Sequence, residues 1–169
     1  LCVSRIAGEK HLDLAFESFQ AMNATAKQNS LLVITGDGPL LEHYQKKYPW
    51  ALYTGYQTGD DLATIYASAD VFVFPSPTET LGNVVLEAQA SGCPPIVVNR
   101  GGVLMNVEHD VNGLITDYDH PHTFKEAMER LYFDPSLRAK LKGASVKASE
   151  TKSWPHVFND LMGVYQTLL

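Results

Sequence analysis

The pattern that most constrains the fold is an alternation of short apolar runs with longer segments of helical period. Parallel strands must be joined by long crossovers of this kind, whereas antiparallel strands can be joined by a tight turn. The runs are rich in Val, Ile and Phe, as buried strands are. We therefore expect about six parallel strands, at residues 1–6, 31–36, 51–56, 70–76, 94–99 and 112–116.

The segments between the runs have the character of helices that lie on a sheet. In the first of them, one apolar stripe is formed by Leu12, Ala15, Phe16 and Phe19. After residue 116 the strand pattern stops, and helices are expected at 121–133, 135–149 and 154–169. The sequence thus predicts an α/β fold, a doubly wound, Rossmann-like parallel sheet with C-terminal helices, in a single domain spanning residues 1–169.

Composition narrows the classes of function. The chain has 169 residues, 45% of them hydrophobic, and a formal net charge of -6. This charge argues against nucleic acid as a partner, because nucleic-acid binding needs clustered Lys and Arg. No apolar run in the sequence reaches the length of about 18 residues that suggests a membrane-spanning helix. We expect a cytoplasmic protein.

The cysteines and the start of the chain add two expectations. Cys2 and Cys93 match no metal or redox spacing, so they are expected to be reduced, buried thiols. The opening LCVSRI already has the character of a strand interior and carries no Met. We therefore expect a fragment of a longer protein.

Open parallel sheets bind ligands at the carboxyl ends of their strands, so the loops at these ends are the candidate sites. The first loop, SRIAGEK, carries Arg5 and Lys10 beside a glycine turn. A guanidinium fork and a reaching ammonium suit a diphosphate, and helix N–H groups add partial positive charge. The alternative is a pair of solvated surface cations.

The second loop is GDGP, with Gly36, Asp37 and Gly38. It lacks the third glycine of a dinucleotide fingerprint, because Leu41 occupies that position. The loop is therefore either part of a nucleotide site or a tight turn into a helix with Pro39 at its first position.

The third loop, in PTETLGNVVLEAQASG, places Glu79 ahead of a helix and Glu87 two turns inside it. Gly82 permits a ligand to approach the backbone, and free N–H groups of the first turn donate to phosphate or sugar oxygens. Carboxylates suit sugar hydroxyls. The alternative makes Glu79 a partner of the helix dipole and Glu87 a solvated residue. Helical phase predicts a polar face of Thr80, Asn83 and Glu87 and an apolar face of Leu81, Val84, Val85 and Ala88.

The remaining loops carry weaker signals. The glycine pair of VNRGG, 98–102, suits either a ligand loop or a turn. Asp117 and Asp119 precede a helix, so turn formation and capping explain them better than a metal site does. The six histidines show no metal-ligand spacing. We expect no metal and no cofactor.

Four of these loops, in order, resemble those of the C-terminal, donor-binding domain of GT-B-fold retaining glycosyltransferases of family 4. The matching stretches cover nearly the whole chain, and the most specific is the segment from Glu79 to Glu87 with the preceding ASADVFVFPS. The others are SRIAGEKHLDL, LLVITGDGPLLE, YTGYQTGDDL, GGVLMNVEHDVNGLI and KSW. The resemblance implies one half of a GT-B fold, a UDP- or GDP-sugar donor and metal-independent transfer with retention.

The resemblance also implies roles for individual residues. Arg5 and Lys10 would grip the donor diphosphate, while Glu79 would address the transferred sugar and steady charge during transfer. Glu87 would anchor the ribose. The other donor-binding residues would be Gly36, Asp37, Gly38, Thr80, Leu81, Gly82 and Asn83.

An acceptor held by a missing N-terminal domain would supply the attacking hydroxyl, so the isolated chain should transfer little. With a lipid acceptor, that domain would bring the enzyme to the cytoplasmic membrane face. The LGNVVLEA stretch is similar to members that glycosylate lipids or use GDP-mannose.

Two alternatives remain, a GT-B-fold epimerase or phosphorylase and a non-catalytic nucleotide-sugar-binding module. The chain departs from the family pattern at Leu104 and Met105, where Pro and an acid are usual, and at Ser4 and His11, where glycine is common. Met105 is the residue that best supports the non-catalytic module.

Overall fold

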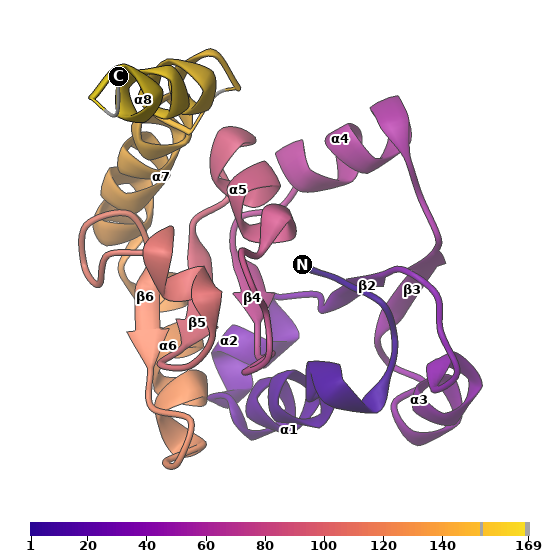
Figure 1. Cartoon of the computed structure of the whole chain (residues 1–169). Coiled ribbons are helices and arrows are strands. Elements are labelled where there is room, and N and C mark those ends of the chain that lie inside the picture. The colour runs from indigo at the N-terminus through magenta and orange to yellow at the C-terminus, as the bar shows by residue number, and fades with distance from the viewer. Residues whose placement is uncertain (153, 168–169) are drawn as a thin grey trace.

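The structure, a computed structural model, describes residues 1–152 and 154–167 (Figure 1). Every expected strand is present, and each is shorter than its apolar run. The strands are β1 (Cys2–Val3), β2 (Val33–Thr35), β3 (Leu52–Gly55), β4 (Phe72–Phe74), β5 (Pro95–Val98) and β6 (Leu114–Thr116).

Helices connect and flank these strands. They are α1 (Leu12–Ala21), α2 (Ala24–Gln28), α3 (Leu41–Lys47), α4 (Gly59–Ala67), α5 (Asn83–Ala90), α6 (His122–Phe133), α7 (Pro135–Glu150) and α8 (Trp154–Thr167), with the 3-10 turns η1 (Gly8–Lys10) and η2 (Gly102–Met105). The three C-terminal helices confirm the expectation, although residues 168–169 lie outside the described residues. The short α2 was not predicted. It begins where the Asn23 side chain accepts a hydrogen bond of 2.9 Å from Thr25 N–H.

All strand pairs are parallel, within two sheets of order β1-β2-β3 and β4-β5-β6. The sheets meet at Leu1, whose amino group donates to Val71 O at 2.9 Å and whose carbonyl accepts from Val73 N–H at 2.8 Å. The strand order across the junction is therefore β3-β2-β1-β4-β5-β6. This order confirms the predicted doubly wound sheet, and its switch point lies between β1 and β4.

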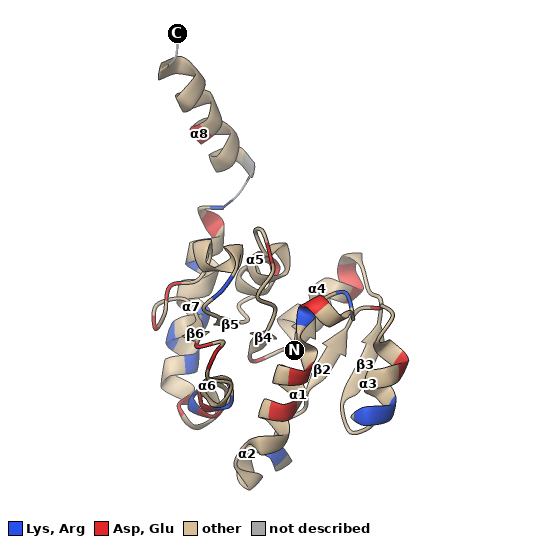
Figure 2. Ribbon diagram, turned by 60° about the horizontal axis from the view of Figure 1, so that its bottom comes forward, with Lys and Arg blue, Asp and Glu red and all other residues tan. Residues whose placement is uncertain are grey.

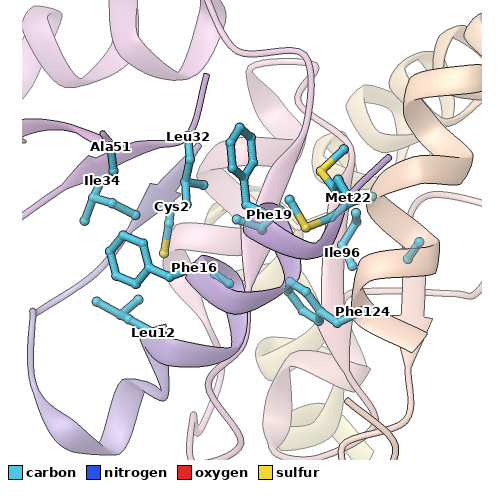
Figure 3. Close-up of a cluster of buried hydrophobic side chains, with 14 of the residues drawn as sticks. Cys2, Leu12, Phe16, Phe19, Met22, Leu32, Ile34, Ala51, Ile96 and Phe124 are labelled. Atoms are coloured by element: carbon cyan, nitrogen blue, oxygen red, sulfur yellow. The ribbon is translucent and has the colours of Figure 1, made fainter. Parts of the chain in front are cut away.

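Strand residues alternate between two apolar layers. On one face Ile96 packs in a cluster with Phe16 of α1 and Phe124 of α6 (Figure 3). On the other face Val97 belongs to a cluster with Tyr66 of α4 and with α5. Burial of one large side chain contributes about 1.5–3 kcal/mol, so the two layers fix the sheet and hold its carboxyl edge in place.

The two thiols are free and buried, as expected. Cys2 and Cys93 are both 0% exposed. Burial raises the pKa of each thiol to about 11, because a buried thiolate loses its hydration. Both therefore behave as small apolar side chains rather than as nucleophiles.

Helix α8 projects away from the rest of the chain (Figure 2). The side chains of residues 155–167 are exposed, including the apolar Val157, Leu161 and Met162. Across the described part of the chain, every helix is too short or too polar to cross a bilayer.

Candidate functional site at the switch point

The loops that follow β1 and β4 meet at the carboxyl edge of the sheet. The β1 loop contains η1, and the β4 loop runs over it toward α5. Ser76 Oγ and Thr78 Oγ1 both donate to the carbonyl oxygen of Glu9, at 3.4 and 3.3 Å. These contacts hold the two loops together and bring their side chains into one site.

Lys10 and Glu79 form an ion pair between Nζ and Oε1 at this junction. Their side chains are only 18% and 20% exposed, so the pair is shielded from much of the solvent. Arg5 lies nearby with a side chain that is 67% exposed, 3.8 Å from Glu9 Oε1. Of the two cations, Lys10 is thus the more shielded, whereas Arg5 forms an exposed ion pair with Glu9.

A cleft of about 260 Å³ opens at the junction. It contains most of the residues predicted for the donor site. Its lining residues are Ser4, Arg5, Lys10, Phe74, Glu79, Thr80, Leu81, Gly82, Asn83 and Val84. The predicted residues Gly36, Asp37, Gly38 and Glu87 do not line it.

The start of α5 differs from the prediction. Gly82 has φ 75°, a left-handed conformation that cannot continue a right-handed helix, so α5 begins at Asn83. Thr80 therefore precedes the helix and does not share a helical face with Asn83 and Glu87. Leu81 was wrongly placed on the apolar face, since it lies ahead of the helix and is 45% exposed.

The glycine pair 101–102 supports the Glu79 loop from behind. Gly102 N–H donates to Glu79 O at 2.6 Å. A Cβ at Gly102 would meet Thr80 O at 1.7 Å, so only glycine permits this approach. Neither glycine lines the cleft. The pair is therefore a structural support for the Glu79 loop.

The GDGP loop lies against the β1 loop. Ile6 N–H donates to Asp37 O at 2.8 Å, and Leu40 N–H donates to Ile6 O at 3.1 Å. A Cβ at Gly36 would meet Ser4 O at 1.9 Å, which explains the glycine there. Leu40 lies in a turn, and Leu41 is the first residue of α3. The placement of Pro39 at the first helical position was therefore wrong.

Glu87 is oriented by a residue that the sequence analysis missed. Tyr66 Oη donates to Glu87 Oε2 at 2.9 Å, although the Tyr66 side chain is almost fully buried. Burial, and then the negative charge of Glu87, raise the pKa of Tyr66. The phenol therefore keeps its proton and remains a donor.

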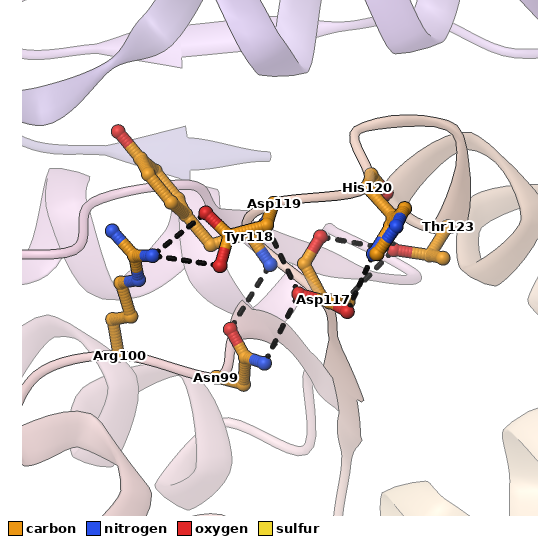
Figure 4. A network of polar contacts seen from close by, with 7 residues as sticks. All are labelled: Asn99, Arg100, Asp117, Tyr118, Asp119, His120 and Thr123. Carbon is orange, nitrogen blue, oxygen red and sulfur yellow. Dashed lines mark hydrogen bonds and ion pairs between the residues drawn. The ribbon is translucent and has the colours of Figure 1, made fainter.

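The loops after β5 and β6 form a second polar cluster on the same edge (Figure 4). The Asp117 carboxylate accepts from Asp119 N–H at 3.0 Å and pairs with His120 Nδ1 at 2.7 Å, which confirms the predicted turn. The hydrogen bond from His120 lowers the pKa of Asp117 and, reciprocally, raises that of His120. Tyr118 Oη lies 3.0 Å from His11 Nδ1 and so connects this cluster to the β1 loop.

No metal site emerges from residues 1–152 and 154–167, where groups of three or more His, Cys, Asp or Glu side chains with metal-binding geometry are absent.

Comparison with known proteins gives a family match. Residues 1–147 match the family described as Glycosyl transferases group 1. The chain is 33% identical over 168 residues to a GDP-mannose-dependent alpha-mannosyltransferase of Corynebacterium glutamicum, covering 99% of this chain and 39% of the relative. It is 34% identical over 167 residues to a protein of the same name from Mycobacterium tuberculosis, covering 98% and 42%. The chain thus spans about two fifths of the length of these curated relatives.

Solved structures show the same fold. Anabaena Alr3699/HepE in complex with UDP matches with a TM-score of 0.80 at 17% identity, over 99% of this chain and 49% of that one. The pneumococcal O-GlcNAc transferase GtfA in complex with UDP and GlcNAc matches with a TM-score of 0.82 at 20% identity, over 98% and 35%. These matches confirm the doubly wound fold predicted from the strand pattern and the half of a GT-B architecture that the family resemblance implied.

Proposed function

Because this chain belongs to the glycosyl transferases group 1 family, we propose that it is the donor-binding domain of a retaining, metal-independent glycosyltransferase. Residues 1–169 would form one nucleotide-sugar-binding domain of a longer enzyme. An N-terminal domain would hold the acceptor, and α8, with its exposed apolar side chains, would pack against that domain.

The observation that carries this proposal is the contact between Lys10 and Glu79 in one cleft. A nucleotide sugar presents a doubly charged diphosphate beside a sugar with several hydroxyls. A cation next to a carboxylate matches these two neighbouring groups, since ammonium binds phosphate and carboxylate accepts from hydroxyls. The backbone at the start of α5 adds N–H donors on the same side.

The proposed reaction breaks the bond between the anomeric carbon and the diphosphate oxygen and forms a bond from that carbon to the acceptor oxygen. The acceptor proton passes to the departing diphosphate. Lys10 and Arg5 neutralise the charge that develops on the leaving group, which lowers the barrier. Glu79 accepts from sugar hydroxyls and faces the positive charge on the sugar ring.

At the other end of the donor, Glu87 would hold the ribose. It lies one helical turn beyond Asn83 on α5, and Tyr66 fixes one of its oxygens. The remaining carboxylate oxygen can accept from a ribose hydroxyl. We place the GDGP loop, residues 36–39, beside the nucleotide, next to Ile6.

For the donor, we propose GDP-mannose as the first candidate and UDP-sugars as the second. Two relatives that match over nearly the whole chain are named GDP-mannose-dependent alpha-mannosyltransferases. The structural neighbours at lower identity carry UDP. A lipid acceptor would place the full-length enzyme at the cytoplasmic face of a membrane.

A non-catalytic module is less well supported. Met105, the residue that favoured it, lies on η2 with 71% exposure and does not line the cleft. Leu104 is likewise outside the lining. The cleft therefore keeps its charged and backbone groups despite these two departures.

Isothermal titration calorimetry of the chain with GDP and with UDP tests the proposal. We expect weak binding of at least one nucleotide, a large loss of affinity in Lys10→Met, and further losses in Arg5→Ala and Glu87→Ala. Lys46→Met is the matched control, because Lys46 is a surface cation whose side chain is 82% exposed and pairs with Glu42. Absence of binding by the wild-type chain, or equal losses in Lys10→Met and Lys46→Met, would refute the donor site.

A donor panel tests the finer assignment. The full-length enzyme should hydrolyse GDP-mannose slowly without acceptor and without added divalent metal. Hydrolysis confined to UDP-sugars would move the donor assignment to UDP, and dependence on a divalent metal would contradict the proposed mechanism.

A further inference from the structure

The segment behind the cleft contains a buried amide that contacts the cleft-lining loop. Asn106, just after η2, is 5% exposed and donates from Nδ2 to Leu81 O at 2.6 Å. Its own backbone carbonyl accepts from Gln89 Nε2 at 3.0 Å and from Asn112 Nδ2 at 3.1 Å. Asn106 is thus held from two sides while its side chain reaches the cleft rim.

Two carbonyls of the cleft loop point back to this segment. Glu79 O accepts from Gly102 N–H, and Leu81 O accepts from Asn106 Nδ2. In a trans peptide the C=O and the next N–H point in opposite directions. All peptide bonds of the described residues are trans. The N–H groups of Thr80 and Gly82 therefore point away from residues 101–106, which lie outside the cleft lining.

The N–H groups of Thr80 and Gly82 lack an acceptor among the residues that the structure describes. Within the described residues, nothing accepts a hydrogen bond from Thr80 N–H or from Gly82 N–H. Both belong to residues that line the cleft beside Lys10. The geometry thus directs two free donors toward the place where an anionic ligand would sit.

We infer that Asn106 is a positioning residue for donor binding: it fixes the Leu81 carbonyl and thereby aims the Gly82 N–H at the donor diphosphate. This inference rests on the proposed function. Glycine makes the fixing necessary, since the peptide between Leu81 and Gly82 can rotate with little steric resistance when no Cβ is present at 82. If that peptide rotated, a carbonyl oxygen would face the phosphates and repel them.

Packing alone does not account for an amide here. Asn106 Oδ1 is buried and, among the described residues, has no hydrogen-bond partner. A buried unpaired oxygen is unfavourable, and an apolar side chain of similar size would avoid it. The amide cannot be turned around, because Leu81 O can only accept and needs the Nδ2 donor.

The test compares Asn106→Leu with Thr116→Val. Thr116 also donates one buried side-chain hydrogen bond to a backbone carbonyl, Val97 O at 3.0 Å, but it lies in β6, which contributes no residue to the cleft lining. Each variant loses one such bond, and N106L also removes the orphan oxygen. We expect N106L to be at least as stable to heat as T116V, yet to bind GDP on the order of tenfold more weakly. T116V should bind GDP like the wild type.

Amide resonances in 15N-labelled chain give a readout that a stability change would not mimic. When GDP is titrated into the wild type, the Thr80 and Gly82 amide protons should move downfield. In N106L the Gly82 response should disappear, whereas the Thr80 response should persist because Gly102 still holds its peptide. Equal Gly82 responses in N106L and wild type, or binding losses that follow thermal stability across both variants, would overturn the inference.

Asn106→Asp provides a second variant that keeps the side-chain shape. At neutral pH its carboxylate would repel Leu81 O, so the Gly82 response should be lost, and protonation in acid should restore a donor and the response. Persistence of the response at neutral pH would contradict the positioning role. If the amide protons of the wild-type chain respond to neither GDP nor UDP, the proposed function itself fails. If the wild type binds normally and the variants respond as it does, only the positioning role of Asn106 fails.

Discussion

Lys10 and Glu79 are ion-paired across the switch point, although 69 residues separate them in the chain. In the free protein the two charges neutralise each other. If the cleft is the proposed donor site, a diphosphate would bind only when Lys10 exchanges the carboxylate for phosphate oxygens. Glu79 would then be available to the sugar, and its negative charge would oppose binding of a nucleotide without a sugar.

This relationship predicts that Glu79→Gln has opposite effects on GDP affinity and on the rate of sugar transfer. GDP affinity should rise by about fivefold, because the variant frees Lys10 and removes a negative charge near the phosphates. Sugar transfer by the full-length enzyme should fall by at least about a hundredfold, if Glu79 stabilises charge at the sugar. Calorimetry and donor turnover measure the two quantities, and Glu42→Gln, on an exposed pair with Lys46, is the control. A fall in GDP affinity would show that Glu79 does not restrain Lys10.

Tyr66→Phe should weaken nucleotide binding through the ribose. The variant keeps the buried ring and removes the hydrogen bond to Glu87 Oε2, so unfolding should become easier by no more than about 1 kcal/mol. Affinity for GDP and for guanosine should fall by the same factor, a few-fold, since both contain ribose. Lys10→Met should affect only the ligand with phosphates. A Tyr66→Phe effect confined to GDP would contradict the assignment of Glu87 to the ribose.

Gly82→Ala should destabilise the protein more than Gly59→Ala. Both glycines have left-handed φ values, 75° and 56°, so each substitution adds backbone strain of about 1 kcal/mol. Only at position 82 would the new Cβ meet another group, Val103 Cγ1 at 2.5 Å, whereas nothing lies within 4 Å at position 59. We expect roughly 1–2 kcal/mol more loss for Gly82→Ala in urea unfolding. Equal losses would show that the approach of Val103 imposes no constraint.

The fold was predictable because its signals are repetitive. Each buried strand contributes several apolar residues and each crossover a helical stripe, so a misplaced boundary does not alter the parallel arrangement. The stripe at Leu12, Ala15, Phe16 and Phe19 is buried in full. Pro95 is the first residue of β5. Proline is tolerated at this position because a residue inside the strand would have to donate an N–H to the neighbouring strand, and proline has none.

The site was less predictable because its geometry depends on contacts across the chain. Helical phase alone placed Thr80 and Leu81 inside the predicted helix, whereas the left-handed conformation of Gly82 makes the helix begin at Asn83. Tyr66 and Asn106 form hydrogen bonds to Glu87 and to Leu81, and no local spacing signals either contact. His11, where the family commonly has glycine, adopts φ 51° and gains a contact with Tyr118 that glycine could not make.

His120→Ala should reduce thermal stability only in a defined pH range. Asp117 raises the pKa of His120 above its usual 6.5. The contribution of protonated His120 to folding stability is therefore fully present below pH 6.5 and is lost as pH rises through the pKa of the folded state. Conversely, the pKa of Asp117 is lowered, so the contribution of its carboxylate to folding stability is present above pH 3.8 and is lost as pH falls through the pKa of the folded state. The difference between wild type and variant should therefore be greatest between pH 3.8 and 6.5.

Thermal melts at several pH values measure this difference, and added salt should shrink it because both groups are exposed. His43→Ala serves as the control, since no carboxylate partner of His43 is found in the described part of the chain. A deficit in His120→Ala that persists unchanged in alkaline solution would assign the effect to packing rather than to the ion pair.

The most direct test of the central claim is a crystal structure of the chain with bound GDP or UDP. We predict that the diphosphate lies in the cleft between Lys10 and the start of α5, within about 4 Å of Lys10 Nζ, with the Lys10 to Glu79 contact broken and the ribose at Glu87. A separate groove of about 550 Å³, lined by residues that include Leu31 and Leu52, offers the alternative location. Nucleotide found there, with Lys10 still paired to Glu79, would contradict the account.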